Sequence, residues 1–245
     1  MPTLETPALV LRRADYKDYD RMVTLFTPEH GRIDAIARGC RRPKSPLMNA
    51  VEPMTSGDYQ LYVSRDRYSI DQCQIKENFY PIRLDYDRLL HGAYWMHLLE
   101  AVVVPEAPLP DLFLITLRAL AHLAWSDLPL PLLTMAFEMH LMAQLGFAPR
   151  MDSCLICGKP VDGDARFDAE LGGTVCLNCL SQAPRISNGA RRILMKLPRT
   201  TYDRAALLVG HPSWPEAARH FRVYILDRLH MDKGLPPLPE EIDEG

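Results

Sequence analysis

Alternating apolar and polar positions characterise the first eighty residues of the chain. Five short runs rich in Val, Ile, Tyr, Phe and Thr are separated there by turn-like segments. So many strands in so short a segment favour a closed barrel, because closure removes the exposed edges of a small sheet. The five-stranded OB barrel is the natural candidate, although a β-sandwich fragment would give a similar pattern. The predicted strands are residues 8–13, 22–27, 31–38, 57–64 and 67–75.

A helical period replaces the alternation from residue 85 onward. Apolar residues then recur at three- and four-residue steps, as on a helix with one buried face. Ser213 and Glu216 have the spacing of a capping box for a last helix over residues 217–230. From Gly234 the chain is Pro-rich and then acidic, and we expect this tail to fray. The predicted buried face of the first helix comprises Leu89, Leu90, Ala93, Met96, His97 and Leu99.

Four cysteines interrupt the helical pattern as two CxxC pairs. Cys154 and Cys157 are followed, after eighteen residues, by Cys176 and Cys179. This spacing is typical of a structural zinc site, and the Gly-rich segment between the pairs has too few large apolar residues to fold without a metal. Two disulfides, or one redox-active pair, are the alternatives. Four thiolates leave no open position for a substrate, so the predicted zinc is structural.

These patterns together predict an α+β protein. We expect an OB domain at residues 1–80, a helical domain in two parts at 81–149 and 183–245, and a four-cysteine zinc-ribbon insertion at 150–182. At 245 residues and 47% hydrophobic content, the chain is long enough for one or two cores.

Composition favours a cytoplasmic protein. The N-terminal residues carry no basic start and no apolar run, so no signal peptide is expected, and no segment is apolar enough to span a membrane. Cys40 and Cys73 stand apart from the CxxC pairs, and isolated thiols suit a reducing compartment. The net charge of −3 is unevenly distributed: residues 81–180 are acidic, and residues on either side are slightly basic.

Two basic clusters are candidates for contact with a polyanion. Arg38, Arg41, Arg42 and Lys44 lie within seven residues that Gly39 and Pro43 keep out of regular structure, so we expect an exposed loop. An ordinary solvated loop is an equally good interpretation of this composition alone. The second cluster has six cations and one acid between residues 185 and 204. Its DNA-contact candidates are Arg191, Arg192 and Lys196.

Aromatic residues on the predicted strands offer a second kind of contact. Tyr59, Tyr62 and Tyr68 could stack on nucleic-acid bases, although each is more simply a core or edge residue.

Four segments resemble the bacterial RecO family of recombination mediators, in the same order along the chain. They read V-T-L-F-T-P-E-H-G-R-I at 23–33, A-R-G-C-R-R-P-K-S at 37–45, L-G-F-A-P-R-M-D-S-C-L-I-C-G at 145–158 and R-I-S-N-G-A-R-R-I-L at 185–194. The chain departs from the family at 17–20, where K-D-Y-D replaces the frequent Glu-x-Asp.

The resemblance implies a non-enzymatic role in DNA recombination and the repair of DNA damage. RecO-like proteins have an OB barrel, a helical domain and a zinc ribbon; they bind single- and double-stranded DNA and anneal complementary strands. With RecR they help to load RecA onto strands coated with single-stranded-DNA-binding protein (SSB). By position, Arg38, Arg41, Arg42 and Lys44 would contact DNA, the four cysteines would hold Zn²⁺, and the protein would be nucleoid-associated in the cytoplasm.

Other functions have weaker support. A zinc-ribbon RNA-binding or transcription-associated factor would also combine an OB barrel with basic loops. An enzyme, or a protein with a small-molecule substrate, is disfavoured because the sequence has no GxxxxGK[ST], GxGxxG or HExxH motif. The histidines His91, His97, His122 and His140 lie on apolar helices and are predicted to be core residues rather than ligands.

Overall fold

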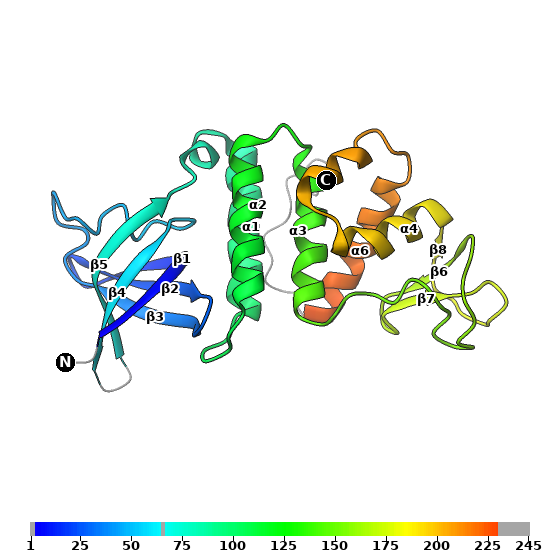
Figure 1. Ribbon diagram of the computed structural model, residues 1–245, viewed down its shortest axis with the longest axis horizontal. Helices are drawn as coiled ribbons and strands as arrows, with labels where there is room; N and C mark the ends of the chain where they lie inside the picture. Colours follow the sequence, from blue (N-terminus) through cyan, green and yellow to red (C-terminus); the bar gives the residue numbers. More distant parts are fainter. Residues whose placement is uncertain (1–2, 65–66, 230–245) are drawn as a thin grey trace. The chain divides into compact units, whose positions relative to one another are not determined.

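A computed structural model describes residues 3–64 and 67–229 of the chain (Figure 1). Contacts divide these residues into two compact units: one extends to Trp125 and the other begins at Ser126. The predicted N-terminal barrel is confirmed as a closed five-stranded barrel with the order β1-β2-β3-β5-β4. Its strands are β1 Thr3–Tyr16, β2 Asp20–Thr27, β3 Gly31–Ala37, β4 Ser56–Ser64 and β5 Arg67–Glu77.

Closure of the barrel depends on the long strand β1. This strand pairs with β4 through its first half and with β2 through its second, and its register with β2 shifts between Val10 and Arg12. Such a bulge bends a strand, which lets β1 pass from one neighbour to the other. β3 and β5 complete the circle as a parallel pair, with Ala35 opposite Tyr68. The enclosed core is built mainly from Val, Leu, Ile and Ala side chains.

Two helices complete the first unit. They are α1, Tyr86–Val102, and α2, Pro110–Trp125, preceded by the short 3₁₀ helix η1, Tyr80–Leu84. Backbone hydrogen bonds join the α1–α2 connection to the β2–β3 turn: Arg32 donates to the Val104 carbonyl, and Leu109 donates to the Pro28 carbonyl. The barrel and the first two helices therefore belong to one compact unit.

The buried face of α1 differs from the predicted one. Leu89 and Ala93 are exposed, whereas Tyr94 and Trp95 are buried. Gly92 lies on the buried face, where a Cβ would lie 2.7 Å from Met54 Sδ, so a larger residue there would require the Met54 side chain to move. The buried residues of α1 are His91, Gly92, Tyr94, Trp95, Met96, Leu98 and Leu99.

The second unit combines helices with a small sheet. Helix α3, Leu130–Gln144, is buried from Leu132 to Met142. The sheet, ordered β7-β6-β8, carries the cysteine segment. The remaining elements are β6 Ala165–Asp168, β7 Gly173–Val175, β8 Arg185–Ile186, α4 Asn188–Lys196, η2 Leu197–Arg199, α5 Tyr202–Ala205, η3 Ala206–Leu208 and α6 Trp214–Leu229. The predicted acidic tail lies outside the described residues.

The prediction of a capping box at the start of α6 is wrong, because Glu216 does not pair with Ser213. Its carboxylate instead accepts hydrogen bonds from the backbone N–H and the hydroxyl of Ser187, the N-cap residue of α4. A local sequence motif cannot reveal this link, because the two residues that it joins are 29 positions apart in the sequence.

Candidate nucleic-acid interface and metal centre

The basic loop leaves β3 and is anchored to the barrel. Its cations, Arg38, Arg41, Arg42 and Lys44, are all exposed. Beneath them Cys40, Leu47, Ala50 and Val51 are buried in the barrel core. The Gly39 N–H also donates to Asp20 Oδ1 at 2.8 Å. The loop therefore presents its charges from a fixed backbone.

The four cations of this loop are not equally available. Arg41 lies 3.3 Å from Asp15 and is partly neutralised by it, and the Arg42 guanidinium lies over the Tyr19 ring, 5.3 Å from its centroid. Arg38 and Lys44 form no ion pair with any described residue. They are the strongest candidates for a phosphate contact, because no internal bond must first be broken.

A hollow on the barrel surface adjoins this loop at Arg38. It encloses about 540 Å³ where β3 meets the β4–β5 hairpin, and Arg67 also lines it. Tyr62 and Tyr68, both half-buried, contribute ring surface. Two guanidinium groups and two aromatic rings around one concave surface suit a nucleotide, whose phosphate and base need those two kinds of contact. Arg67 is not among the DNA-binding residues predicted from the sequence. Its position next to the polar turn between the last two predicted strands could have indicated it.

Tyr59 does not belong to this surface. Its side chain is 1% exposed, and its hydroxyl donates to the Ala50 carbonyl at 2.6 Å inside the barrel. The core interpretation therefore holds for Tyr59, and base stacking through it is excluded.

Arg191 is also removed from the predicted DNA-binding set. Its side chain is 3% exposed, and its guanidinium donates to the carbonyl oxygens of Met151 and Gly163 at 2.6 and 3.2 Å and to Asn188 Oδ1 at 2.9 Å. A group so enclosed cannot reach a phosphate. Arg191 instead attaches α4 to the segment that carries the cysteines.

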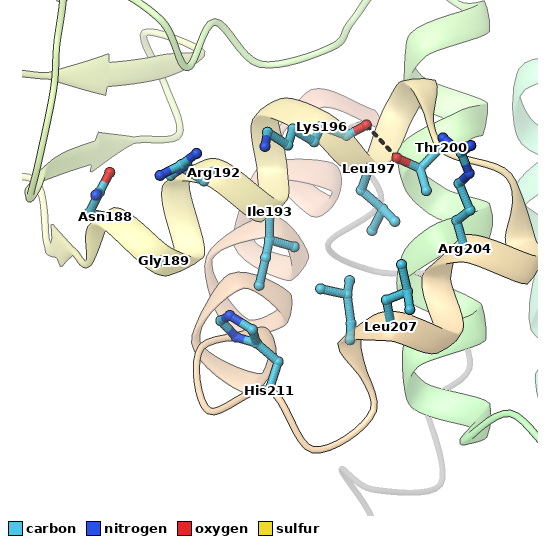
Figure 2. A pocket seen from close by; sticks show the side chains of 11 residues that line it. Asn188, Gly189, Arg192, Ile193, Lys196, Leu197, Thr200, Arg204, Leu207 and His211 are labelled. Atoms are coloured by element: carbon cyan, nitrogen blue, oxygen red, sulfur yellow. Dashed lines mark hydrogen bonds between the residues drawn. The ribbon is translucent and has the colours of Figure 1, made fainter.

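Arg192 and Lys196 are exposed, four residues apart on α4. They border a groove of about 610 Å³ between α4 and the segment from Thr200 to His211. Figure 2 shows apolar side chains of Ile193 and Leu197 in this groove, with Arg204 on the opposite wall. Three of the six cations of the predicted second cluster, Arg192, Lys196 and Arg204, thus form the rim of a groove with an apolar floor.

The four CxxC cysteines converge on one point. All four sulfur atoms lie within 4.8 Å of one another, with Cys154 Sγ 3.9 Å from Cys179 Sγ and Cys157 Sγ 3.8 Å from Cys176 Sγ. These distances are far beyond a disulfide bond of about 2.05 Å. They match the edge of a tetrahedron with metal–sulfur bonds of about 2.3 Å, which is about 3.8 Å. The cluster can therefore hold one metal ion.

Electrostatics within the cluster support that use. Although burial opposes it, backbone N–H groups near Cys154 lower the pKa of this thiol to about 6, which favours the thiolate that metals bind. Hydrogen bonds with Cys176 and Cys157 raise the pKa of Cys179 to about 12. A thiolate at Cys179 is thus disfavoured beside the thiolate of Cys154. A cation at the centre of the cluster would stabilise both thiolates.

Family models match almost the whole chain. Residues 1–79 match "Recombination protein O N terminal" and residues 83–234 match "Recombination protein O C terminal". Among the described residues, no helix is both long and apolar enough to cross a bilayer.

Curated relatives agree with these matches. "DNA repair protein RecO" of Alkaliphilus metalliredigens is 35% identical over 176 residues, which cover 72% of each chain. The protein of the same name from Acetivibrio thermocellus is 32% identical over 197 residues, 79% of this chain and 78% of that one. That of Moorella thermoacetica is 28% identical over 238 residues, 93% of this chain and 88% of that one. From the matches over both halves and from these identities, the chain belongs to the RecO family of DNA repair proteins.

Proposed function

We propose that this protein binds single- and double-stranded DNA and anneals complementary strands, and that with RecR it helps to load RecA onto SSB-coated DNA. The observation that carries the DNA-binding part is the hollow where Arg38 and Arg67 stand beside Tyr62 and Tyr68. The partner proteins rest on the family relationship.

The barrel surface would hold a single strand by two separate interactions. Arg38 and Lys44, which need not release an internal partner, would neutralise phosphates and release counterions. A base turned into the hollow would stack on Tyr62 or Tyr68, a contact worth about 1–3 kcal/mol and tolerant of sequence. A protein that pairs complementary strands of any sequence must bind DNA without sequence preference.

Arg192 and Lys196 would supply a second anionic contact in the second unit. Neutralisation of phosphates on two strands lowers their mutual repulsion, so pairing can nucleate without an energy source. Annealing therefore requires only binding and exchange of the two strands.

Zinc is the ion we propose for the cysteine cluster. Four thiolates in a tetrahedron suit Zn²⁺ and leave no position for a substrate, so its role would be structural. The ion would hold together the CxxC segments, each of which contributes only two ligands.

The salt dependence of DNA binding tests the proposed barrel surface. Fluorescence anisotropy with an unstructured single-stranded oligonucleotide, measured from low to moderate salt, separates phosphate contacts from stacking. We expect Arg38→Ala to weaken binding and to reduce the slope of log K against log salt by about 0.7, the value for one phosphate contact on single-stranded DNA. We expect Tyr62→Leu to weaken binding about 5- to 100-fold with the slope unchanged.

Two exposed cations outside both proposed surfaces serve as the matched control. Arg118→Ala/Lys159→Ala also removes positive charge and should leave the slope unchanged. A slope that falls equally in the control and in Arg38→Ala would contradict the assignment of this surface. An RNA oligonucleotide of the same sequence provides a further comparison, since tighter binding to RNA would favour the RNA-binding alternative.

A further inference from the structure

The four sulfur atoms of the cysteine cluster are not equally shielded from solvent. Cys154 is 1% exposed, whereas Cys157 is an exposed residue. The two others, Cys176 and Cys179, are half-buried. Gly158 follows Cys157 directly, and a Cβ at this glycine would have no atom within 4 Å. A small oxidant can therefore reach Cys157 from solvent, while the chain covers Cys154.

A sulfur atom that can pair with Cys157 already lies close to it. Cys176 Sγ is 3.8 Å from Cys157 Sγ, and the two residues belong to different CxxC pairs. A disulfide of about 2.05 Å requires these two atoms to approach each other by about 1.8 Å. We propose that Cys157 is an oxidation site: a hydroperoxide such as H₂O₂ joins Cys157 to Cys176 as a disulfide, and this releases the metal ion and loosens the attachment of α4.

The reaction balances as a two-electron oxidation of two thiolates. The Cys157 thiolate attacks the peroxide, so that an S–O bond forms, the O–O bond breaks and hydroxide leaves. The Cys176 thiolate then attacks the sulfenic acid, so that the S–S bond forms and a second hydroxide leaves. Two protons from solvent convert both hydroxides to water. The peroxide is the only oxidant needed.

The two cysteines of the barrel are poorer targets for the same oxidant. Cys40 is buried and Cys73 is half-buried, and burial raises the pKa of both thiols. Both therefore stay protonated at neutral pH, whereas the thiolate is the form that attacks a peroxide. A cysteine that binds a metal is deprotonated. The preference for the cluster thus rests on the zinc site put forward under the proposed function.

Helix α4 is attached to the stretch of chain that carries the first CxxC pair. Arg191 donates to the carbonyl oxygens of Met151 and Gly163 at 2.6 and 3.2 Å. The Asn188 N–H donates to Asp164 Oδ1 at 2.8 Å. These three acceptors lie on either side of the CxxC pair, in a described stretch without helix or strand.

Oxidation changes this stretch because it removes two of the four metal ligands. A disulfide sulfur carries no negative charge, and two remaining thiolates do not complete a tetrahedral site. The stretch has no regular structure of its own, so loss of the ion leaves its backbone without a fixed position. The acceptors of Arg191 and Asn188 then move, and α4 is held less firmly.

Titration of the full chain with H₂O₂ tests the proposal. Free thiols are labelled in denaturant with a light maleimide, and oxidised ones with a heavy maleimide after reduction, so that mass spectrometry gives the oxidised fraction of each cysteine. We expect Cys157 and Cys176 to be oxidised together, at least about fivefold faster than Cys40 and Cys73. Non-reduced digests should contain a Cys157–Cys176 disulfide within one chain.

Two further readings follow the consequences in the same samples. A chromogenic chelator should detect metal release in step with the disulfide. Amide hydrogen exchange in α4 should accelerate at least about fivefold, and dithiothreitol with added Zn²⁺ should reverse the change. Cys73→Ser, which removes a thiol outside the cluster, is the matched control and should respond as the wild type does. Because the disulfide is mapped in the wild type, the test needs no variant that lacks a ligand.

Several results would overturn the proposal. They are earlier oxidation of Cys40 or Cys73, a disulfide from Cys157 to Cys154 or to another copy of the chain, and unchanged exchange in α4 once the Cys157–Cys176 disulfide is complete. Metal analysis before oxidation tests the zinc proposal separately. Protein that holds no zinc, yet still forms the Cys157–Cys176 disulfide first, would contradict the zinc proposal and support the oxidation site.

Discussion

Two adjacent arginines on α4 show how little residue type reveals about role. Arg191 is enclosed and donates to the carbonyl oxygens of Met151 and Gly163, whereas Arg192 is exposed on the rim of the groove. In the sequence, both belong to the same basic cluster, and nothing local distinguishes them. Only the packing of α4 against the cysteine segment separates them.

Substitution of these two arginines should therefore have opposite effects. Arg191→Met removes a buried donor and leaves carbonyl oxygens unpaired, so we expect the free energy of unfolding to fall by about 2–4 kcal/mol. Arg192→Met should change stability by less than about 0.5 kcal/mol but weaken DNA binding. Urea unfolding and anisotropy measure the two effects. A stable Arg191→Met with weakened DNA binding would reverse our assignment.

His91 makes stability depend on pH. It is buried in α1, and burial lowers its pKa to about 4, although nearby Asp87 acts in the opposite direction. Because an unfolded histidine has a pKa of about 6.5, the unfolded chain binds more protons between these values, and stability falls as pH falls from about 6.5 to 4. Between pH 7 and 4.5 we expect His91 alone to cost about 2–3 kcal/mol.

Urea unfolding of the wild type and of His91→Gln at both pH values checks this expectation. The wild type should lose about 2–3 kcal/mol more than the variant over this range. Equal losses would show that another group controls the acid sensitivity.

At the scale of elements, the β2–β3 turn holds the barrel and helices of the first unit together. Gly31 in this turn has φ of 63°, and a Cβ there would lie 2.2 Å from the Val104 carbonyl oxygen in the α1–α2 connection. The adjacent Arg32 N–H donates to that same oxygen at 3.1 Å. A side chain at residue 31 would therefore separate two backbones that must touch.

Gly31→Ala should lower the free energy of unfolding by about 2–4 kcal/mol, since left-handed backbone costs about 1–2 kcal/mol and the contact adds to it. Gly146→Ala is the matched control, with φ of 80° and no atom within 4 Å of its Cβ, and should cost only about 1–2 kcal/mol. Hydrogen exchange at the Arg32 amide should accelerate only in Gly31→Ala. Equal destabilisation by both substitutions would show that the contact contributes nothing.

The cysteine segment is the element that a metal should organise. We expect one zinc ion per chain, lost in Cys157→Ser but retained in Cys73→Ser, because Cys73 lies in the barrel, away from the cluster. After chelation, hydrogen exchange should accelerate in the backbone from residue 150 to 186, where a three-stranded sheet is the only regular structure. Metal analysis and exchange mass spectrometry measure both effects. Zinc retained by Cys157→Ser would contradict the proposed ligand set.

Local sequence patterns predict some of the elements and not others. The barrel strands and the cysteine cluster follow local rules, alternation and CxxC spacing, and both were predicted from sequence. The buried face of α1 was not, because apolar residues lie on several sides of this helix, and periodicity does not show that Tyr94 and Trp95 are buried while Leu89 is exposed. The bond of Glu216 to Ser187 and the enclosure of Arg191 depend on contacts distant in sequence, which local motifs do not contain.

At the scale of the whole molecule, charge is separated along the chain. The described part of the second unit after the cysteines is basic, whereas residues 235–245 are acidic.

The central claim, that this protein pairs DNA strands through the basic loop of its barrel, is tested most directly by annealing. Complementary oligonucleotides are coated with cognate SSB and mixed without nucleotide, with wild type, with Arg38→Ala/Arg41→Ala/Arg42→Ala/Lys44→Ala, or with Arg118→Ala/Lys159→Ala. We predict rapid, salt-sensitive annealing by the wild type and the Arg118/Lys159 control, and loss of annealing in the loop variant. Absence of annealing by the wild type, or full activity of a folded loop variant, would contradict the claim.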